Sequence, residues 1–320
     1  MTDRQALLIS PQELAEVLAV ERDVFRVGGA PLPKTVVLDV RWSLAEPDGR
    51  EAFKAGHVPG AVYVDLESEL SGHGPATEGR HPLPSDETLT RAARRWNLWP
   101  GDRVVAYDGG GNLAAARAWW LLRDAGVEVR LLDGAWPAWL AAGLPVETAA
   151  DDTGADDPDT DDTGAYPEAD LDFIPPGGAR PKITLAGGQM PKLTLEEAAS
   201  WARDAVLLDA RAAERYSGET EPIDPRAGHV PGARSLPTTG NVDADGRFLE
   251  LQELRARFEA AGVGFGADDA PVAAYCGSGI TASHALFALE LAGRRGALFP
   301  GSWSQWANHL ELPVVTGANP

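Results

Sequence analysis

The 320-residue chain contains one cysteine, Cys276, and it opens the glycine-rich stretch CGSGIT at residues 276–281. An apolar run precedes this stretch and a helical pattern follows it. Glycines at 277 and 279 would let backbone N–H groups turn inward, and a following helix N-terminus adds partial positive charge. Both features favour the thiolate, the nucleophilic form of cysteine. A lone cysteine is often a small buried hydrophobe, but this loop favours a nucleophile at Cys276.

The elements around this loop alternate between short apolar runs and helical patterns. Examples are VVLDV (36–40) and RVVAYD (103–108), followed in turn by AAARAWWLLRDAG (114–126). Such alternation predicts parallel strands joined by helices, the α/β class. Ligands of open α/β sheets bind beyond the carboxyl ends of the strands. The pattern places Cys276 at such an end.

The chain repeats itself, with five blocks recurring in the same order. The paired blocks are VVLDVR and VLLDAR, GHVPGA twice (56–61 and 228–233), VVAYDGGG and VAAYCGSG, LLDGAWPAW and LFPGSWSQW, and GLPV and ELPV. The repeat places Asp108 at the position of Cys276, and a carboxylate cannot act as a sulfur nucleophile. The two copies therefore differ in role.

The repeat also predicts the domain organisation. One domain is expected at 1–150 and a second at 183–320. Residues 151–182 are rich in Asp, Gly and Pro and open with too few apolar residues to offset the entropy of ordering. They are expected to form an acidic linker.

Composition excludes several classes of function. The formal net charge is 28 − 48 = −20, which opposes binding to nucleic acid or anionic membranes. No stretch approaches the roughly 20 apolar residues of a membrane span, and the N-terminus does not resemble a signal peptide. A single cysteine cannot form an internal disulfide. A cytoplasmic protein is expected, and the spacing of the histidines predicts no metal site.

These motifs resemble the two-domain rhodanese family of sulfurtransferases. The tandem copies, the DxR and GHVPGA blocks, the cysteine loop in the second copy only and the closing GSWxxW carry the resemblance. It implies tandem rhodanese-like domains, each a small parallel sheet with helices on both faces, and no metal or organic cofactor. The loop CGSGIT resembles the CGSGVT of the 3-mercaptopyruvate sulfurtransferase branch, whereas the thiosulfate branch carries Arg and Lys after its cysteine.

The resemblance implies a ping-pong reaction. Cys276 would take a sulfane sulfur from a small anionic donor and hold it as a persulfide. The acceptor would be cyanide or a thiol, such as thioredoxin or a low-molecular-weight thiol. A thiosulfate:cyanide sulfurtransferase and a persulfide carrier in a sulfur relay remain the alternatives.

The resemblance also suggests the other site residues. Arg215 would hold the donor's carboxylate, with Arg226 as a second clamp, and the loop residues Gly277, Gly279, Ile280 and Thr281 would line the donor site. Ser278, His57 and Asp48 would handle protons. The alternative for His57 is structural, because His229 occupies the same place in the second copy.

Two other classes fit less well. A cysteine phosphatase needs an arginine six residues after the cysteine, and that residue is Ala282. A non-catalytic binding module matches the first copy, which lacks the cysteine, but not the second.

Overall fold

The structure, a computed structural model, describes residues 4–26, 33–148, 181–201 and 203–320. Apart from its last two residues, the expected linker at 151–182 lies outside the described residues. The domain boundaries stay a prediction.

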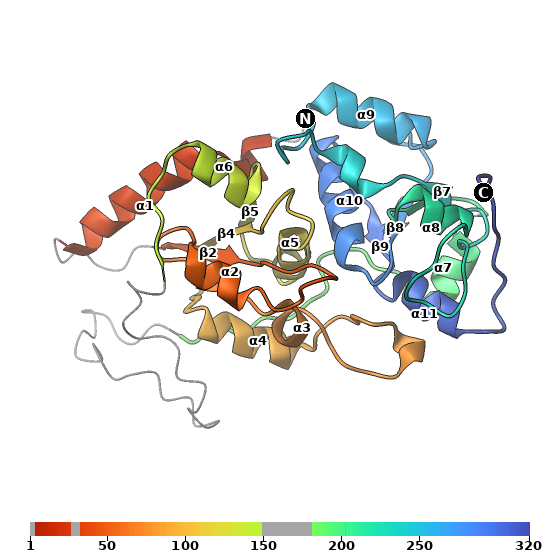
Figure 1. The fold of residues 1–320 in the computed structure, drawn as a ribbon, viewed down its shortest axis with the longest axis horizontal. Coiled ribbons are helices and arrows are strands. Elements are labelled where there is room, and N and C mark those ends of the chain that lie inside the picture. Colours follow the sequence, from red (N-terminus) through yellow and green to blue (C-terminus); the bar gives the residue numbers. More distant parts are fainter. Residues whose placement is uncertain (1–3, 27–32, 149–180, 202) are drawn as a thin grey trace.

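Two parallel sheets organise the described chain, one in each half (Figure 1). The first has the order β1-β5-β4-β2-β3 and the second the order β7-β6-β8-β9, and every pairing is parallel. This confirms the α/β class. The first sheet contains β1 (Leu8–Ile9), β2 (Thr35–Asp39), β3 (Val62–Tyr63), β4 (Arg103–Tyr107) and β5 (Val129–Leu132). The second contains β6 (Val206–Asp209), β7 (Arg234–Ser235), β8 (Val272–Tyr275) and β9 (Ala297–Leu298).

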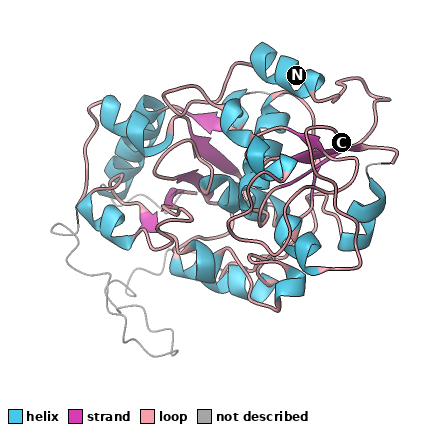
Figure 2. Ribbon diagram, turned by 45° about the vertical axis from the view of Figure 1, so that its right-hand side comes forward, coloured by secondary structure: helices cyan, strands magenta, loops and turns pink. Residues whose placement is uncertain are grey.

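Helices surround the strands (Figure 2). The N-terminal half contains η1 (Arg4–Ala6), α1 (Pro11–Arg26), α2 (Arg50–Ala55), α3 (Leu66–Glu69), η2 (Ala76–Glu78), α4 (Asp86–Arg95), α5 (Ala115–Asp124) and α6 (Ala135–Ala141). The C-terminal half contains α7 (Leu195–Trp201), α8 (Ala213–Ser217), η3 (Thr238–Asn241), α9 (Leu251–Ala260), α10 (Ile280–Leu291) and α11 (Ser302–Asn308). Among the described residues, no helix is long and apolar enough to cross a bilayer.

Alternate strand side chains face opposite sides of each sheet, and both sides are covered by helices. In the first half, Val37 and Val105 belong to a cluster with residues of α1 and α6, while Val36 and Val104 belong to a cluster with α4 and α5. The second half repeats this division, with α7 and α11 on one face and α9 and α10 on the other. Each sheet therefore has helices on both faces, as predicted.

The faces covered by α5 and α10 share one hydrophobic core, so the two halves are packed together. Trp119 of α5 meets Phe287 of α10 edge to face, with ring centroids 4.9 Å apart. At the far end of α10, Arg123 donates to Glu290 over 2.7 Å. Both helices follow the loop that carries the residue at the cysteine position. The packing therefore brings the Asp108 loop and the Cys276 loop to the same interface.

The DxR and GHVPGA blocks form the same contact in both halves. Arg41 donates to the Gly56 carbonyl and Arg211 to the Gly228 carbonyl, each over 2.6 Å. Each arginine also pairs with the aspartate two residues before it. In each half the arginine therefore holds the end of a central strand to the GHVPGA turn, which is a structural role.

Each half sends a connection across to the other. Residues 71–84 of the first half reach α11, where Gln305 donates to the Thr77 carbonyl over 3.1 Å. Residues 242–248 of the second half reach the first half, where the amide of Phe248 donates to Asp133, just after β5, over 3.2 Å. A Cβ on Gly246 would lie 3.2 Å from the amide nitrogen of Gly111 in the Asp108 loop. The loop of each half is therefore covered by a segment of the other half.

The shared core generates a prediction about stability. Trp119→Ala removes a fully buried indole and should lower the free energy of unfolding by about 3–5 kcal/mol. Denaturant unfolding, monitored by circular dichroism and by fluorescence, should show a single transition that is destabilised for both halves together. The control Val20→Ala, at an exposed position, should change stability by less than about 0.5 kcal/mol. Loss of one half's transition alone would contradict a common core.

Candidate active site

Cys276 directly follows β8 at the carboxyl end of the second sheet, and only 2% of it is exposed. The amide of Gly279 donates to Cys276 Sγ over 3.1 Å. Gly279 has φ +82°, and a Cβ there would lie 2.3 Å from the Pro300 carbonyl oxygen, so only glycine fits. Ile280 then begins α10. The loop therefore presents an amide and a helix N-terminus to the sulfur, as the sequence predicts.

The start of α11 holds the loop from the other side. The Cys276 amide donates to Ser302 Oγ over 3.1 Å, and its carbonyl accepts from the Trp303 amide over 3.0 Å. The Gly277 carbonyl accepts from the Ser304 amide over 2.8 Å. Ser304 Oγ in turn accepts from the Arg80 amide over 3.1 Å. The closing GSWxxW block therefore anchors the cysteine loop and links it to the first half.

The equivalent loop in the first half shows how such a loop holds an anion. The carboxylate of Asp108 accepts from the amides of Gly110, Asn112, Ala114 and Ala115 at 2.8–3.3 Å. Burial raises the pKa of Asp108 to about 6, and these four hydrogen bonds act in the opposite direction. The loop's own side chain therefore fills the anion position, and no thiol is present there.

A chain of three polar side chains ends beside Cys276. Ser278 Oγ lies 2.7 Å from His81 Nδ1, and His81 Nε2 lies 3.1 Å from Glu67 Oε2. Trp42 Nε1 donates to Glu67 Oε1 over 2.7 Å and contacts the His81 ring edge to face. Ser278 and His81 are buried. The serine of the second half is thus joined to a histidine of the first.

The contacts of His81 fix its tautomer. A carboxylate only accepts hydrogen bonds, so the proton of the neutral ring lies on Nε2 toward Glu67, and Nδ1 accepts from the Ser278 hydroxyl. Burial lowers the pKa of His81, Glu67 raises it, and the nearby charges of Arg117 and Arg80 lower it further. The neutral ring can therefore take up a proton through Ser278. Ser278, His81 and Glu67 thus have the arrangement of a general base that is oriented by a carboxylate.

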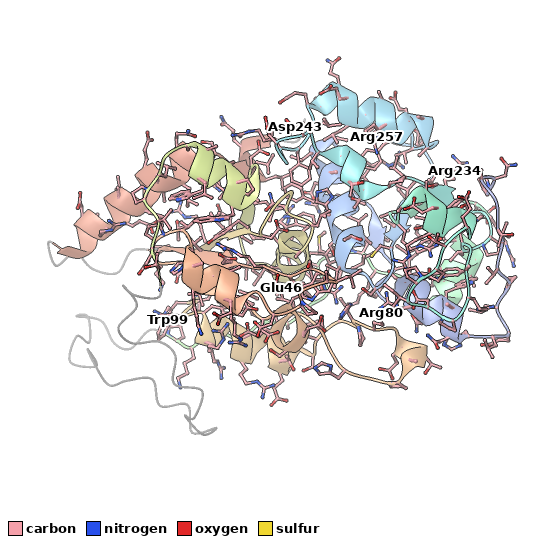
Figure 3. All side chains as sticks on the ribbon, viewed as in Figure 1. Glu46, Arg80, Trp99, Arg234, Asp243 and Arg257 are labelled. Atoms are coloured by element: carbon pink, nitrogen blue, oxygen red, sulfur yellow. The ribbon has the colours of Figure 1, made fainter. Side chains whose placement is uncertain are left out.

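Two guanidinium groups flank Gly277. A Cβ on Gly277 would lie 3.2 Å from Arg80 Nη2 and 3.4 Å from Arg215 Nη1. Arg80 comes from the connection at 71–84 and lies beside α11 (Figure 3), whereas Arg215 comes from α8. Arg80 Nε is buried without a hydrogen-bond partner. The predicted Arg215 is thus next to the cysteine loop, together with an arginine of the other half.

Arg117 of α5 lies fully buried at the back of the site. Its guanidinium donates to the carbonyls of Gly279, His81, Pro82 and Leu70 at 3.0–3.3 Å. Burial lowers the pKa of Arg117 to about 10, and the electrostatic influence of the neighbouring Cys276 acts in the opposite direction. Arg117 therefore remains a cation at neutral pH and connects the cysteine loop to the segment that carries His81.

The expected partnership of Ser278 with His57 and Asp48 is wrong. His57 Nδ1 bonds the Phe53 carbonyl over 2.9 Å, its ring stacks on Phe53, and its backbone pairs with Glu147. Asp48 is exposed and pairs with Arg50. These contacts are local to the GHVPGA turn of the first half. The histidine that contacts Ser278 is His81.

His229 explains why the turn histidine is structural. Its Nδ1 bonds the Tyr216 carbonyl over 2.8 Å, its ring stacks on Tyr216, and its backbone pairs with Val315. This arrangement reproduces the one around His57. Both copies place this histidine in the same local contacts, which favours the structural alternative for His57.

Arg226, which was expected to bind the donor's carboxylate together with Arg215, instead binds backbone carbonyls near α11. Its guanidinium donates to the carbonyls of Trp306, Ala307, His309 and Leu312 at 2.7–3.0 Å. These carbonyls lie at and beyond the C-terminal end of α11, where helix carbonyls lack intrahelical partners. Arg226 therefore caps α11, and the second arginine beside Gly277 is Arg80.

The last two loop residues contribute in different ways. Ile280 is buried in the shared core, while Thr281 is partly exposed in the first turn of α10. Ile280 therefore fixes the helix start. A role for either residue in donor binding stays a prediction, as it does for Gly277 and Gly279.

Sequence reasoning missed His81, Glu67, Arg80 and Arg117. A signal existed in the repeat: residues 79–81 read GRH, and residues 246–248 read GRF. Because the connections cross between the halves, the histidine of one copy reaches Ser278 in the cysteine loop, whereas the phenylalanine of the other copy packs on α10 of its own half. Comparing the connections as well as the five blocks would have singled out His81.

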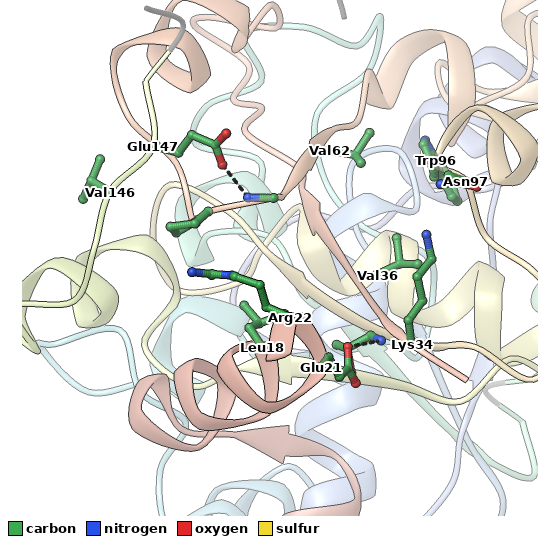
Figure 4. Close-up of a pocket in the computed structure, with 13 residues that line it drawn as sticks. Leu18, Glu21, Arg22, Lys34, Val36, Val62, Trp96, Asn97, Val146 and Glu147 are labelled. Atoms are coloured by element: carbon green, nitrogen blue, oxygen red, sulfur yellow. Dashed lines mark hydrogen bonds between the residues drawn. The ribbon is translucent and has the colours of Figure 1, made fainter. Parts of the chain in front are cut away.

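A cavity of about 700 Å³ lies elsewhere on the first half (Figure 4). Its wall includes Glu21, which accepts from the Thr35 amide over 2.8 Å, and Glu147, which accepts from the Gly60 amide over 2.5 Å. Thr35 begins β2, so the cavity borders the amino end of a strand. No residue of the cysteine loop lines this cavity, and neither do Arg80, His81 or Arg215, so it is separate from the cysteine site. Within the described ranges, no group of three or more His, Cys, Asp and Glu side chains could hold a metal ion.

The fold consists of two related α/β halves, and the site is a buried cysteine loop of the second half that contacts polar side chains of the first. A family model described as Rhodanese-like domain matches residues 29–142 and 194–309. The chain belongs to the rhodanese family, and it is a sulfurtransferase.

Individual relatives cover the chain almost completely. The chain is 39% identical over 318 residues, 99% of either chain, to the candidate thiosulfate sulfurtransferase SseB of Mycobacterium tuberculosis. It is 33% identical over 290 residues to the 3-mercaptopyruvate sulfurtransferase of Escherichia coli K12, covering 88% of this chain and 92% of that one. The crystal structure of SseA from Escherichia coli matches with a TM-score of 0.69 at 28% identity, over 92% of this chain and 98% of that chain. The names of these relatives divide between two sulfur donors.

The position of Arg226 generates a second prediction. Arg226→Ala should remove four hydrogen bonds to carbonyls at the end of α11 and lower the free energy of unfolding by about 1–3 kcal/mol. The KM for the sulfur donor should change less than twofold, because Arg226 does not face the loop. Thermal unfolding and steady-state kinetics measure both quantities. A large rise in the KM for the sulfur donor with unchanged stability would indicate instead that Arg226 binds the donor.

Proposed function

We propose that this sulfurtransferase takes its sulfur from 3-mercaptopyruvate and carries it on Cys276 as a persulfide. The observation that carries the proposal is the contact of Ser278 with His81 over 2.7 Å, with Glu67 on the far side of the ring. Proton handling of this kind beside the sulfur nucleophile suits a 2-oxo acid donor better than thiosulfate.

The leaving groups explain this difference. Removing sulfur from thiosulfate breaks an S–S bond and releases sulfite, which needs no proton to be stable. Removing sulfur from 3-mercaptopyruvate breaks a C–S bond, and the electron pair goes to C3 of a pyruvate enolate. That carbon must be protonated, so a group that moves a proton at the site accelerates the step.

The first half-reaction is balanced in atoms and in charge by the residues of this site. Ser278 and His81 accept the proton of the donor's thiol, and the Cys276 thiolate attacks the donor's sulfur. The Sγ–S bond forms as the C–S bond breaks, and the proton returns through Ser278 to C3. A thiolate and 3-mercaptopyruvate thus become a persulfide anion and pyruvate. The overall charge is unchanged.

Arg80 and Arg215 are suited to hold the donor's carboxylate. Both guanidinium groups reach Gly277, adjacent to Cys276, and a carboxylate accepts two such donors at once. The loop itself carries no cation after the cysteine, because residues 277 and 278 are glycine and serine. A singly charged donor is therefore favoured over the thiosulfate dianion.

The second half-reaction passes the sulfur to a thiol or to cyanide. A thiol attacks the outer sulfur, the Sγ–S bond breaks, and the Cys276 thiolate is restored. In this proposal the N-terminal half carries no sulfur, since Asp108 occupies the cysteine position. It is nevertheless required, because it supplies His81, Glu67, Arg80 and Arg117.

Turnover with the two donors, measured side by side, tests the proposed donor. We expect kcat/KM for 3-mercaptopyruvate to exceed that for thiosulfate by about tenfold or more, a difference of at least ~1.4 kcal/mol in transition-state binding. Intact mass after donor treatment should show one added sulfur on the wild type and none on Cys276→Ser. Preference for thiosulfate would overturn the donor assignment, and sulfur transfer by the serine variant would overturn the role of Cys276.

The chain offers a matched pair of histidines to test the proton path. His81→Gln should lower kcat with 3-mercaptopyruvate by about 10²-fold or more, with a much smaller effect on thiosulfate turnover. His57→Gln removes a buried histidine of the same half and should leave the ratio of the two donors unchanged. Equal losses with both donors in His81→Gln would indicate that His81 only supports the loop.

A further inference from the structure

The two arginines beside Gly277 are bridged by one carboxylate. Asp224 Oδ1 pairs with Arg80 Nη1, and Asp224 Oδ2 lies 3.4 Å from Arg215 Nη2. The Asp224 side chain is only 3% exposed. The remaining Nη atoms, Arg80 Nη2 and Arg215 Nη1, are those that face Gly277. Asp224 thus binds both cations on the side away from the cysteine loop.

The charges of the surrounding cluster sum to zero. Arg215 also pairs with Glu221 over 2.6 Å, Glu221 lies 3.3 Å from Arg211, and Arg211 pairs with Asp209 over 2.6 Å. Three guanidinium groups (Arg80, Arg211 and Arg215) therefore meet three carboxylates (Asp209, Glu221 and Asp224). Of the three carboxylates, Asp224 is the one that touches both arginines beside the loop.

We propose that Asp224 is a specificity-determining residue that keeps the donor site selective for singly charged donors. The inference rests on the proposed function, because it assigns the donor anion to Arg80 and Arg215. Asp224 orients the two guanidinium groups and at the same time cancels part of their charge. The site offers directed hydrogen-bond donors without the excess positive charge that a dianion needs.

The effect on two donors differs because electrostatic energy scales with ligand charge. A buried carboxylate near the site repels a dianion about twice as strongly as a monoanion in the same place. Thiosulfate therefore loses more than 3-mercaptopyruvate from the presence of Asp224. The same charge acts little on a reaction step that does not involve the donor, such as transfer from the persulfide to cyanide.

Asp224→Asn tests the inference, since asparagine keeps the shape and an acceptor oxygen but removes the charge. The ratio of kcat/KM for thiosulfate to that for 3-mercaptopyruvate should rise about tenfold, or ~1.4 kcal/mol. The rise should shrink with added salt, because salt screens charge interactions. Asp224→Glu keeps the charge and should retain the wild-type ratio of kcat/KM for the two donors. It also tests the effect of the charge at this position if Asp224→Asn folds poorly.

Glu290→Gln is the matched control. Glu290 is also a buried carboxylate that pairs with an arginine of the other half, Arg123, but it lies at the far end of α10 from the loop. Its loss changes net charge equally and should leave the donor ratio within twofold. An unchanged ratio in Asp224→Asn, or an equal rise in Glu290→Gln, would overturn the inference. A wild type that prefers thiosulfate would refute the proposed donor instead, while the change in ratio would still report on Asp224.

Discussion

Arg117 joins the cysteine loop to the segment that carries His81, although it belongs to the half without the cysteine. Its buried guanidinium donates to the carbonyl of Gly279 in the cysteine loop and to the carbonyls of His81 and Pro82 in the crossing connection. A buried cation is tolerated only when its donors are satisfied and its charge is balanced. Four carbonyls and the nearby Cys276 sulfur provide that environment. The loop, the proton path and the interface between the halves therefore share one support.

The duplication gives each half the same loop and a different use for it. In the first half the Asp108 carboxylate accepts four amide hydrogen bonds and fills the anion position permanently. In the second half Cys276 occupies that position with a group that can bond to an incoming sulfur. The connections that cross the interface differ accordingly: His81 contacts Ser278 of the other half, whereas the Phe248 ring packs on His284 and Phe287 of its own half. In the proposed mechanism the first half supports the chemistry of the second.

The proposals share one physical theme, the balance of charge in a buried space. Arg80 and Arg215 attract a donor anion, Asp224 limits that attraction, and the Glu67 carboxylate orients His81. Arg80 and Arg215 pair with carboxylates, and His81 contacts Glu67. Such balance is expected where ions are removed from water, because an unpaired buried charge is strongly destabilising. Selectivity can then depend on a single carboxylate.

The sequence by itself determined the features that depend on local chain geometry. The repeat, the alternation of apolar runs and the glycines around Cys276 predicted the α/β class and a loop that presents an amide to the sulfur. The sequence also pointed to Arg215, which lies beside the cysteine loop and belongs to the half that contains the cysteine; its binding of the donor stays a prediction. Only the tertiary structure decided that His81 rather than His57 contacts Ser278, and that Arg80 rather than Arg226 flanks Gly277. The reason is that these partners are separated by nearly 200 residues and meet through packing of α5 on α10, whereas the turn histidine stacks on a ring four residues away. Spacing along the chain records local contacts, but it does not record which segment crosses an interface to complete a site.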